Sequence, residues 1–223
     1  MTSLRARKKR ATAQNLAQAA FTLAAQQGFE SVTTDEISAS AGVSRRTFAN
    51  YYPNKHMAVV DGFLQALGVP PRLRQETISS AELPATFEQL ISQTQAFLTE
   101  MFTNGHHIEH IRTFASMVDQ DPSLEPYFHA VMLEFRDSPT HEFLVARFGK
   151  VKVVAFFGAA FGALGGVIQA VLGPFPMRRH LEPGQEPQKD TARPPLPSAE
   201  DVAALRDHFD QAFSYLRHGF ADQ

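Results

Sequence analysis

The chain has 223 residues, of which 43% are hydrophobic, and this is enough for the core of one large domain or two small ones. It contains no cysteine, which excludes disulfides and cysteine-ligated zinc. Its formal net charge of −2 is unevenly distributed: residues 1–60 hold eight Lys and Arg against three acidic residues, a net +5, and the remainder holds 13 against 20, a net −7. A basic first segment on an acidic remainder indicates that only the first segment meets a polyanion such as DNA.

Residues 1–11 form a basic arm without a hydrophobic run, with cations at Arg5, Arg7, Lys8, Lys9 and Arg10. The segment that follows is too polar to be the apolar core of a secretory signal peptide. Two interpretations of the arm stay open: a solvated, disordered tail, and an arm that adds phosphate or minor-groove contacts to DNA. Residues 12–27 are expected to form a helix with one apolar face, which Gly28 ends.

The stretch 33–55 predicts two short helices joined at Gly42 and the start of a third. Thr33 and Glu36 have the spacing of a capping box, in which each side chain satisfies a free amide at the helix start. Gly42 can adopt the positive φ that ends a helix sharply. Ser44 is a good N-cap for the second helix, because its hydroxyl can accept from an amide of the first turn.

The second helix of this stretch has one inward and one outward face. Phe48 and Tyr52, four residues apart, are expected to turn inward. The outer face would then carry Arg45, Arg46, Ala49 and Asn50. A helix, a glycine turn and a second helix with basic residues at its start form the helix–turn–helix pattern, whose second helix enters the major groove of DNA.

These residues resemble the N-terminal domain of the tetracycline-repressor (TetR) family of bacterial regulators. The similar run covers roughly residues 12–60 and contains the pattern T-T-x-x-I-x-x-x-A-G-V-S-x-x-T-F-x-x-Y-Y-x-N-K. The resemblance implies a homodimer that contacts phosphates through Thr34, Thr47, Tyr51 and Lys55. It implies base readout by Arg45, Arg46 and Ala49. Two positions depart from the family: Ala49 stands where an aromatic residue is usual, and His56 where Glu is common.

Beyond this run the sequence predicts helices and no strand, since no segment alternates with a period of two. The expected fold class is all-α, with a helix-turn-helix DNA-binding domain at 1–60 and a larger helical ligand-binding and dimerisation domain at 61–223. Residues 173–198 hold seven of the 14 prolines and are expected to form a flexible loop. The remaining helices are expected at 84–103, 107–118, 121–149 with a break at Ser138–Pro139, 150–172 and from Ser198 onward.

The segment 150–172 allows two interpretations, because it runs from Val153 to Ile168 without a polar side chain. It is either a membrane helix with a small-residue packing face or a buried helix that another helix approaches closely. A spanning helix needs about 20 apolar residues, which favours the buried helix. Two apolar helices at this end of the sequence suit a two-fold four-helix interface, for which the expected residues are Gly158, Gly162, Gly166, Phe209, Phe213 and Leu216.

Metal and catalytic sites have weaker support. His106, Glu109 and His110 fall at i, i+3 and i+4 and could present three ligands to zinc on one helical face. The alternative is a solvated helix start, and since no fourth ligand can be identified we expect no metal. The sequence has no G-x-S-x-G, no H-E-x-x-H and no glycine-rich phosphate loop, so we expect neither an enzyme nor a cofactor.

The expected function is transcriptional regulation in the cytoplasm by a homodimeric repressor that binds a two-fold operator and is released by a small apolar ligand. Most of the 19 phenylalanines lie beyond residue 60, as an apolar effector cavity requires, and Phe97 and Phe114 are its candidate wall. The alternatives are an ungated architectural DNA-binding dimer, a membrane-anchored regulator and a metal-responsive regulator using the His106 group. A cavity beside residues 87–135 would favour the ligand-released repressor, and a solid core there would favour the ungated dimer.

Overall fold

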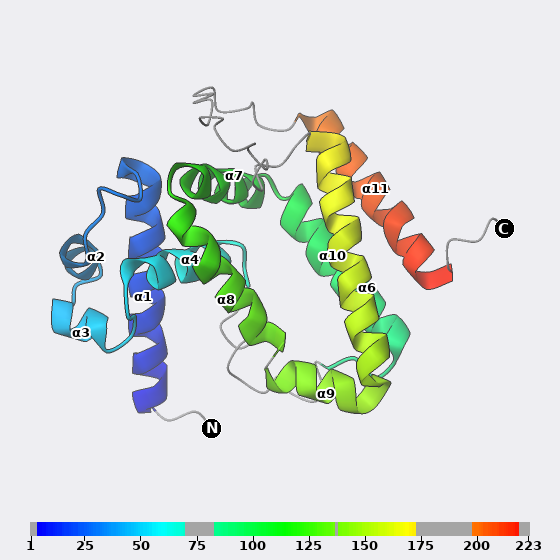
Figure 1. Cartoon of the computed structure of the whole chain (residues 1–223), viewed down its shortest axis with the longest axis horizontal. Coiled ribbons are helices and arrows are strands. Elements are labelled where there is room, and N and C mark those ends of the chain that lie inside the picture. Colours follow the sequence, from blue (N-terminus) through cyan, green and yellow to red (C-terminus); the bar gives the residue numbers. More distant parts are fainter. Residues whose placement is uncertain (1–3, 70–82, 137, 173–197, 219–223) are drawn as a thin grey trace, which may run out of the picture. The chain divides into compact units, whose positions relative to one another are not determined.

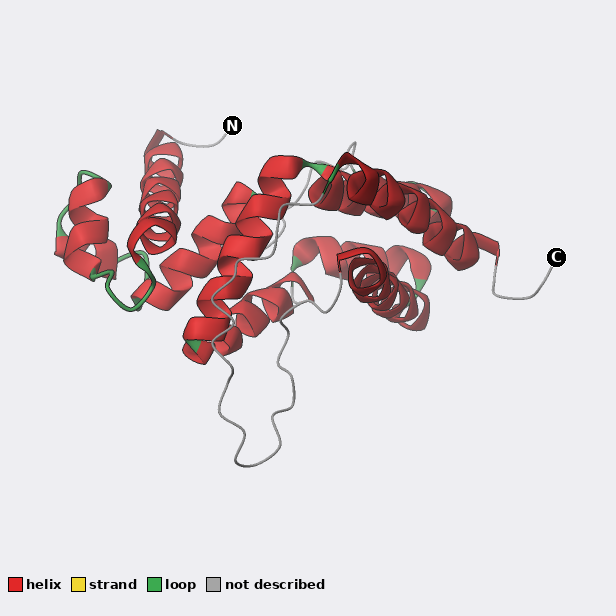
Figure 2. Cartoon of the chain, turned by 90° about the horizontal axis from the view of Figure 1, so that it is seen from above, coloured by secondary structure: helices red, strands yellow, loops and turns green. Residues whose placement is uncertain are grey.

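The computed structural model describes residues 4–69, 83–136, 138–172 and 198–218. Within these ranges every regular element is a helix, so the all-α prediction is confirmed (Figures 1 and 2). The predicted loop 173–198 lies, except for Ser198, outside the described residues. The elements are α1 (Leu4–Gln27), α2 (Thr34–Ser40), α3 (Arg45–Ala49), α4 (Lys55–Ala66), α6 (Phe87–Thr103), α7 (Gly105–Gln120), η1 (Pro122–Leu124), α8 (Glu125–Arg136), α9 (Pro139–Phe148), α10 (Lys150–Leu172) and α11 (Ala199–His218).

Contacts divide the chain into two compact units. Unit 1 comprises Met1–Thr77 and His110–His141, and unit 2 comprises Ile78–Glu109 and Glu142–Gln223. Helices α1 to α4, η1 and α8 therefore belong to unit 1, and α6, α10 and α11 to unit 2, while α7 and α9 cross from one to the other. The functional division into 1–60 and 61–223 stays a prediction.

Unit 1 is organised on the crossing of α1 and α4, which is its most extensive helix contact. Gly62 of α4 permits this crossing: a Cβ built there would lie 2.1 Å from the carbonyl oxygen of Ala17 and 2.7 Å from the Cβ of Phe21. The neighbouring residues Ala58, Val59 and Val60 are buried completely. Because the backbones of α1 and α4 approach so closely, α4 is fixed to α1; α2 packs in turn on α1, and α3 packs on α2 (Figure 1).

Helix α1 is longer than the sequence predicted. It begins at Leu4, so residues 4–11 of the basic arm are helical and the interpretation as a disordered tail is wrong for them. Lys, Arg and Ala have high helix propensity, and a helix already nucleated by packing extends through them at little cost. None of the described side chains before Leu16 is buried, so this extension projects from the core of unit 1.

Unit 2 is a three-helix assembly in which α11 packs on both α6 and α10 (Figure 1). Phe209 and Phe213 of α11 are 0% exposed in the single chain, and the ring centroid of Phe209 lies 6.0 Å from that of Phe102 on α6. The prediction that these two phenylalanines form an interface between copies is therefore wrong. Periodicity identified an apolar stripe on α11, but the chain itself buries it. Among the helices that the structure describes, none is long and apolar enough to cross a membrane.

Candidate nucleic-acid interface

The start of α2 and the turn that follows it have the predicted geometry. The backbone amide of Thr33 donates to Glu36 Oε2 at 2.8 Å, and the amide of Glu36 donates to Thr33 Oγ1 at 3.2 Å. Hydrogen bonds from the Thr33 side chain and backbone lower the pKa of Glu36. Gly42 has a φ of 68°, and Ser44 Oγ accepts from the amide of Thr47 at 3.1 Å. The capping box, the glycine turn and the second N-cap are confirmed.

Helix α3 ends at Ala49 rather than at residue 52, and its inward residues connect it to the rest of unit 1. Phe48 and Tyr52 are both buried, as predicted. The hydroxyl of Tyr52 donates to Asp61 Oδ2 on α4 at 2.8 Å and lies 3.2 Å from the carbonyl oxygen of Ala13 on α1. The side chain of Tyr52 therefore fixes the end of α3 against both α1 and α4.

The outward residues of α2 and α3 form the candidate interface. Arg45, Arg46, Ala49 and Asn50 are exposed, and Thr34, Thr47 and Tyr51 are partly exposed. Arg45 Nη1 lies 3.3 Å from Asp35 Oδ2, but the two side chains are 71% and 64% exposed, and such a surface ion pair contributes little. The first turn of α3 contains no acidic residue. Two guanidinium groups at the positive end of a helix are unfavourable unless an anion lies nearby.

Lys55 occupies a structural position that the sequence did not indicate. Its Nζ donates to the carbonyl oxygens of Phe29 at 2.9 Å, Glu30 at 3.1 Å and Val32 at 2.9 Å, and it lies 4.4 Å above the ring of Phe29. An ammonium group has three donors, and all three are used. Lys55 therefore fastens the loop between α1 and α2 to the start of α4, and the predicted phosphate contact would require it to leave these carbonyls.

His56, the residue after Lys55, is a second feature that sequence reasoning did not assign to the site. Its ring lies between Phe29, at a centroid distance of 4.8 Å and 60°, and Tyr127 of α8, stacked at 4.7 Å and 19°. Its Nε2 is 3.0 Å from Ser123 Oγ. Burial lowers the pKa of His56, the charge of Asp121 raises it, and Lys55 lowers it further. The signal in the sequence is that His56 stands where Glu is common in the family.

The two candidates for a ligand cavity lie in different units of the chain. Phe114 is 6% exposed in unit 1, where its ring stacks on Phe63 of α4 at 4.1 Å with an interplanar angle of 6°, and lies 5.6 Å from Phe128. Phe97 is 39% exposed on α6 in unit 2. Periodicity placed both on central helix faces, yet one belongs to a packed aromatic cluster and the other lies at the surface.

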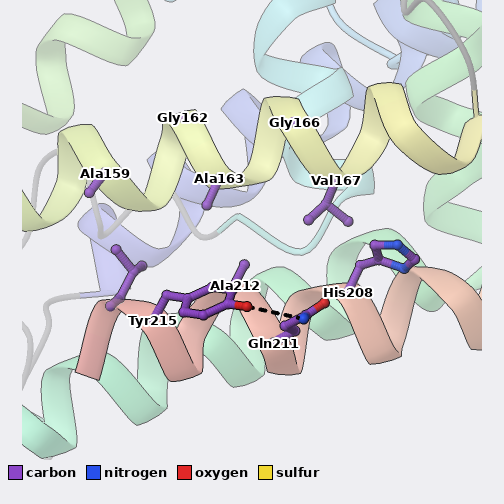
Figure 3. Close-up of a pocket in the computed structure, with 10 residues that line it drawn as sticks. Ala159, Gly162, Ala163, Gly166, Val167, His208, Gln211, Ala212 and Tyr215 are labelled. Carbon is purple, nitrogen blue, oxygen red and sulfur yellow. Dashed lines mark hydrogen bonds between the residues drawn. The ribbon is translucent and has the colours of Figure 1, made fainter. Parts of the chain in front are cut away.

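An apolar pocket of about 410 Å³ lies between α10 and α11 within unit 2 (Figure 3). Gly162 and Gly166 of α10 face Ala212 and Tyr215 of α11 across it, and the predicted interface residue Leu216 also lines it. Apart from the neighbouring atoms of α10 itself, no atom of the described residues lies within 4 Å of a Cβ built at any of the three predicted glycines, which are Gly158, Gly162 and Gly166. Among the described side chains of α10, the large apolar ones that are exposed are Val151, Val154 and Phe161.

The metal alternative finds no support. The described residues contain no group of three His, Asp or Glu side chains that could hold a metal ion. The ring of His110 instead packs edge-on against Phe21 of α1, at a centroid distance of 5.6 Å. His106, Glu109 and His110 share a helix without converging on a common site.

Comparison with protein families gives one match in this part of the chain. Residues 16–56 match the family model described as bacterial regulatory proteins, tetR family. The match begins at the first buried residue of α1, includes α2, the turn and α3, and ends in the first turn of α4. Comparison with curated proteins finds no match.

Proposed function

We propose that the chain, whose residues 16–56 match the tetR family of bacterial regulatory proteins, is a DNA-binding regulator of transcription, and that it acts as a homodimeric, non-enzymatic repressor that a small apolar ligand releases from a two-fold operator in the cytoplasm. The observation that carries DNA reading is the exposed cationic start of α3. Arg45 and Arg46 read base edges, where a guanidinium can bind guanine O6 and N7 together. Ala49 offers a methyl group for a thymine methyl, and Asn50 lies on the same exposed face.

Phosphate contacts position α3 in the groove. The partly exposed hydroxyl groups of Thr34, Thr47 and Tyr51 serve this role. Lys55 acts indirectly in this proposal, because its ammonium holds the loop before α2. The basic extension of α1, residues 4–11, adds further phosphate contacts through its exposed cations.

Support for the homodimer comes from the glycines of α10. Each glycine within a helix costs about 1 kcal/mol relative to alanine, and the chain itself makes no use of the space beside Gly158, Gly162 and Gly166. Val154 and Phe161 lie on the same helix face and are both 52% exposed. We propose that a second copy covers this face, with α10 and α11 of each protomer forming a four-helix interface.

One observation favours the alternative to release by a ligand, which is an ungated DNA-binding dimer. The rings of Phe63 and Phe114 stack on each other, and the tilted ring of Phe128 contacts both, so these three residues form an aromatic cluster in the region where a cavity was expected. An ungated DNA-binding dimer would need only such packed residues and no ligand cavity. Thermal melting with a panel of small apolar compounds separates the two, because a true effector must stabilise the free protein and weaken its DNA binding by the same linkage factor.

The experiment that tests DNA recognition is selection of bound duplexes from a random pool. We expect enrichment of an inverted repeat, since two-fold related reading helices bind half-sites about one helical turn apart or a multiple of it. Enrichment of a single unrepeated site would contradict the homodimer but not DNA reading. If no sequence is enriched over the starting pool, the assignment of Arg45 and Arg46 to base readout is wrong.

A further inference from the structure

The first turn of α4 is held from two sides by three consecutive residues. On one side, Lys55 and His56 contact the loop between α1 and α2: the Lys55 ammonium binds three carbonyls there, and the His56 ring packs edge-on against Phe29. This loop leads directly into α2 of the helix–turn–helix. The start of α4 therefore sets the position of the helices that meet DNA.

On the other side, the same turn contacts the segment Asp121–Tyr127. Asn54 accepts from the amide of Met57 as the cap of α4, and its Nδ2 donates to the Tyr127 hydroxyl at 3.2 Å. The His56 ring stacks on the Tyr127 ring, and its Nε2 meets the Ser123 hydroxyl. The side chain of His56 therefore contacts both the loop before α2, at Phe29, and the segment Asp121–Tyr127, at Ser123 and Tyr127.

We propose that His56 is a positioning residue for DNA binding whose neutral ring clamps the loop before α2 and the segment Asp121–Tyr127 to the start of α4, and whose protonation opens this clamp. The inference rests on DNA binding by the helix–turn–helix and is independent of release by an apolar ligand. It adds the proton as an effector and names the residue through which the proton acts.

The surroundings of His56 oppose the imidazolium. An imidazolium carries a donor on each nitrogen, and Nδ1 of His56 is buried without a hydrogen-bond partner in the described part of the chain. The ring faces Phe29 on one side and the phenol of Tyr127 on the other, neither of which is charged. The charged groups that act on it are Lys55, which repels a positive ring, and Asp121, which attracts it.

These forces determine the direction of the pH dependence. Burial is the largest cause and lowers the pKa of His56 below its ordinary value. A histidine whose pKa is lower in the folded arrangement contributes stability that is complete above the pKa of the unfolded chain and is lost as the pH falls toward the folded pKa. The clamp is therefore closed at neutral pH and opens on acidification, and by linkage DNA binding must lower the pKa of His56 further.

The first test measures the dissociation constant for the selected duplex between about pH 7.5 and about pH 5.5 at fixed ionic strength. Wild type should bind at least about threefold more weakly at the lower pH, within the limit of tenfold per pH unit for one linked proton. His56→Gln keeps an amide that can bond Ser123 but does not titrate, and should lose most of this dependence. His106→Gln, at an exposed position of α7, is the matched control and should follow wild type.

The second test does not depend on the variants folding equally well. Proton NMR of the wild-type protein should show His56 titrating below the ordinary range of a histidine, and addition of the duplex should lower the His56 pKa further. Identical pH profiles for wild type and His56→Gln, or a His56 pKa that the duplex does not change, would overturn the proposal. A protein that enriches no duplex would instead contradict DNA reading and leave the NMR titration of the free protein as the test of the clamp.

Discussion

The region from α1 to α4 and the exposed face of α10 both combine glycines with apolar side chains, a pattern that suits close packing of helices. Only in the first region does another helix that the structure describes pack against this pattern. In the first, Gly62 lies against the backbone of α1, the caps at Thr33 and Ser44 are satisfied, and Tyr52 reaches two helices. On α10, a Cβ added at the glycines of every fourth position would meet no described residue beyond α10 itself, and the large apolar side chains Val154 and Phe161 are exposed. The difference is informative because the first region finds its packing partner within the chain, whereas for the second we propose that a copy of the chain supplies it.

The largest expected effect is the loss of stability when a buried phenylalanine is replaced, compared with an exposed one. Phe114→Ala removes a buried ring that stacks on Phe63 and contacts Phe128, and should lower the free energy of unfolding by about 3–5 kcal/mol. Phe97→Ala removes a side chain that is 39% exposed and should change it by less than about 1 kcal/mol. Urea unfolding of both variants measures the difference. A large loss for Phe97→Ala would mean that a second copy or a ligand covers this ring.

A matched pair of glycine substitutions tests the comparison directly. Gly62→Ala places a methyl group 2.1 Å from a backbone carbonyl and should destabilise by at least about 1–3 kcal/mol through overpacking. Gly162→Ala meets open space in the single chain and should stabilise the helix by about 1 kcal/mol, provided that no copy packs there. Thermal melting measures the change in stability of each variant. Repeating it at several protein concentrations shows whether a second copy packs against the position of Gly162.

The bulkier change Gly162→Leu extends this test to the interface between copies. If α10 of a second protomer lies against this face, the leucine should convert the dimer into monomer or aggregate in sedimentation experiments. Gly105→Leu is a control, since a side chain there also meets no atom of the chain and the position lies outside α10 and α11. A dimer that persists in Gly162→Leu would place the interface elsewhere.

The two regions also explain what the sequence could predict. The capping box, Gly42 and Ser44 involve residues within a few positions of one another, so spacing alone was sufficient. Periodicity identifies the apolar stripe of α11 but does not tell whether the chain itself or a second copy buries it. The sequence therefore predicted Phe209 at an interface between copies, whereas the chain itself buries this residue. The roles of Lys55 and His56 depend on carbonyls and rings that lie up to 71 residues away, between His56 and Tyr127, and no local pattern encodes them.

Base readout is expected to have an effect of intermediate size. Arg46→Ala should cost about 1–3 kcal/mol in binding to the selected duplex if the guanidinium reads a guanine, and much less on random DNA. Arg45→Ala should behave similarly, because the exposed ion pair with Asp35 holds this arginine only weakly. Competition binding with both duplexes measures the ratio. Equal losses on selected and random DNA would mean that these arginines contact phosphates rather than bases.

Substitutions in the basic extension of α1 are expected to have the smallest effect per residue on DNA binding. Arg5, Lys8 and Lys9 are exposed, and residues 4–11 have no described buried side chain that would explain why the helix continues there. If each cation neutralises one phosphate, replacing all three by Gln should lower the slope of log K against log salt by about 2–3, without changing sequence preference. Lys150→Gln with Lys152→Gln removes two cations from unit 2 and should leave the slope unchanged. If the triple variant keeps the wild-type slope, the extension does not meet DNA, and its helicity then reflects only the propagation of α1 through residues that favour helix.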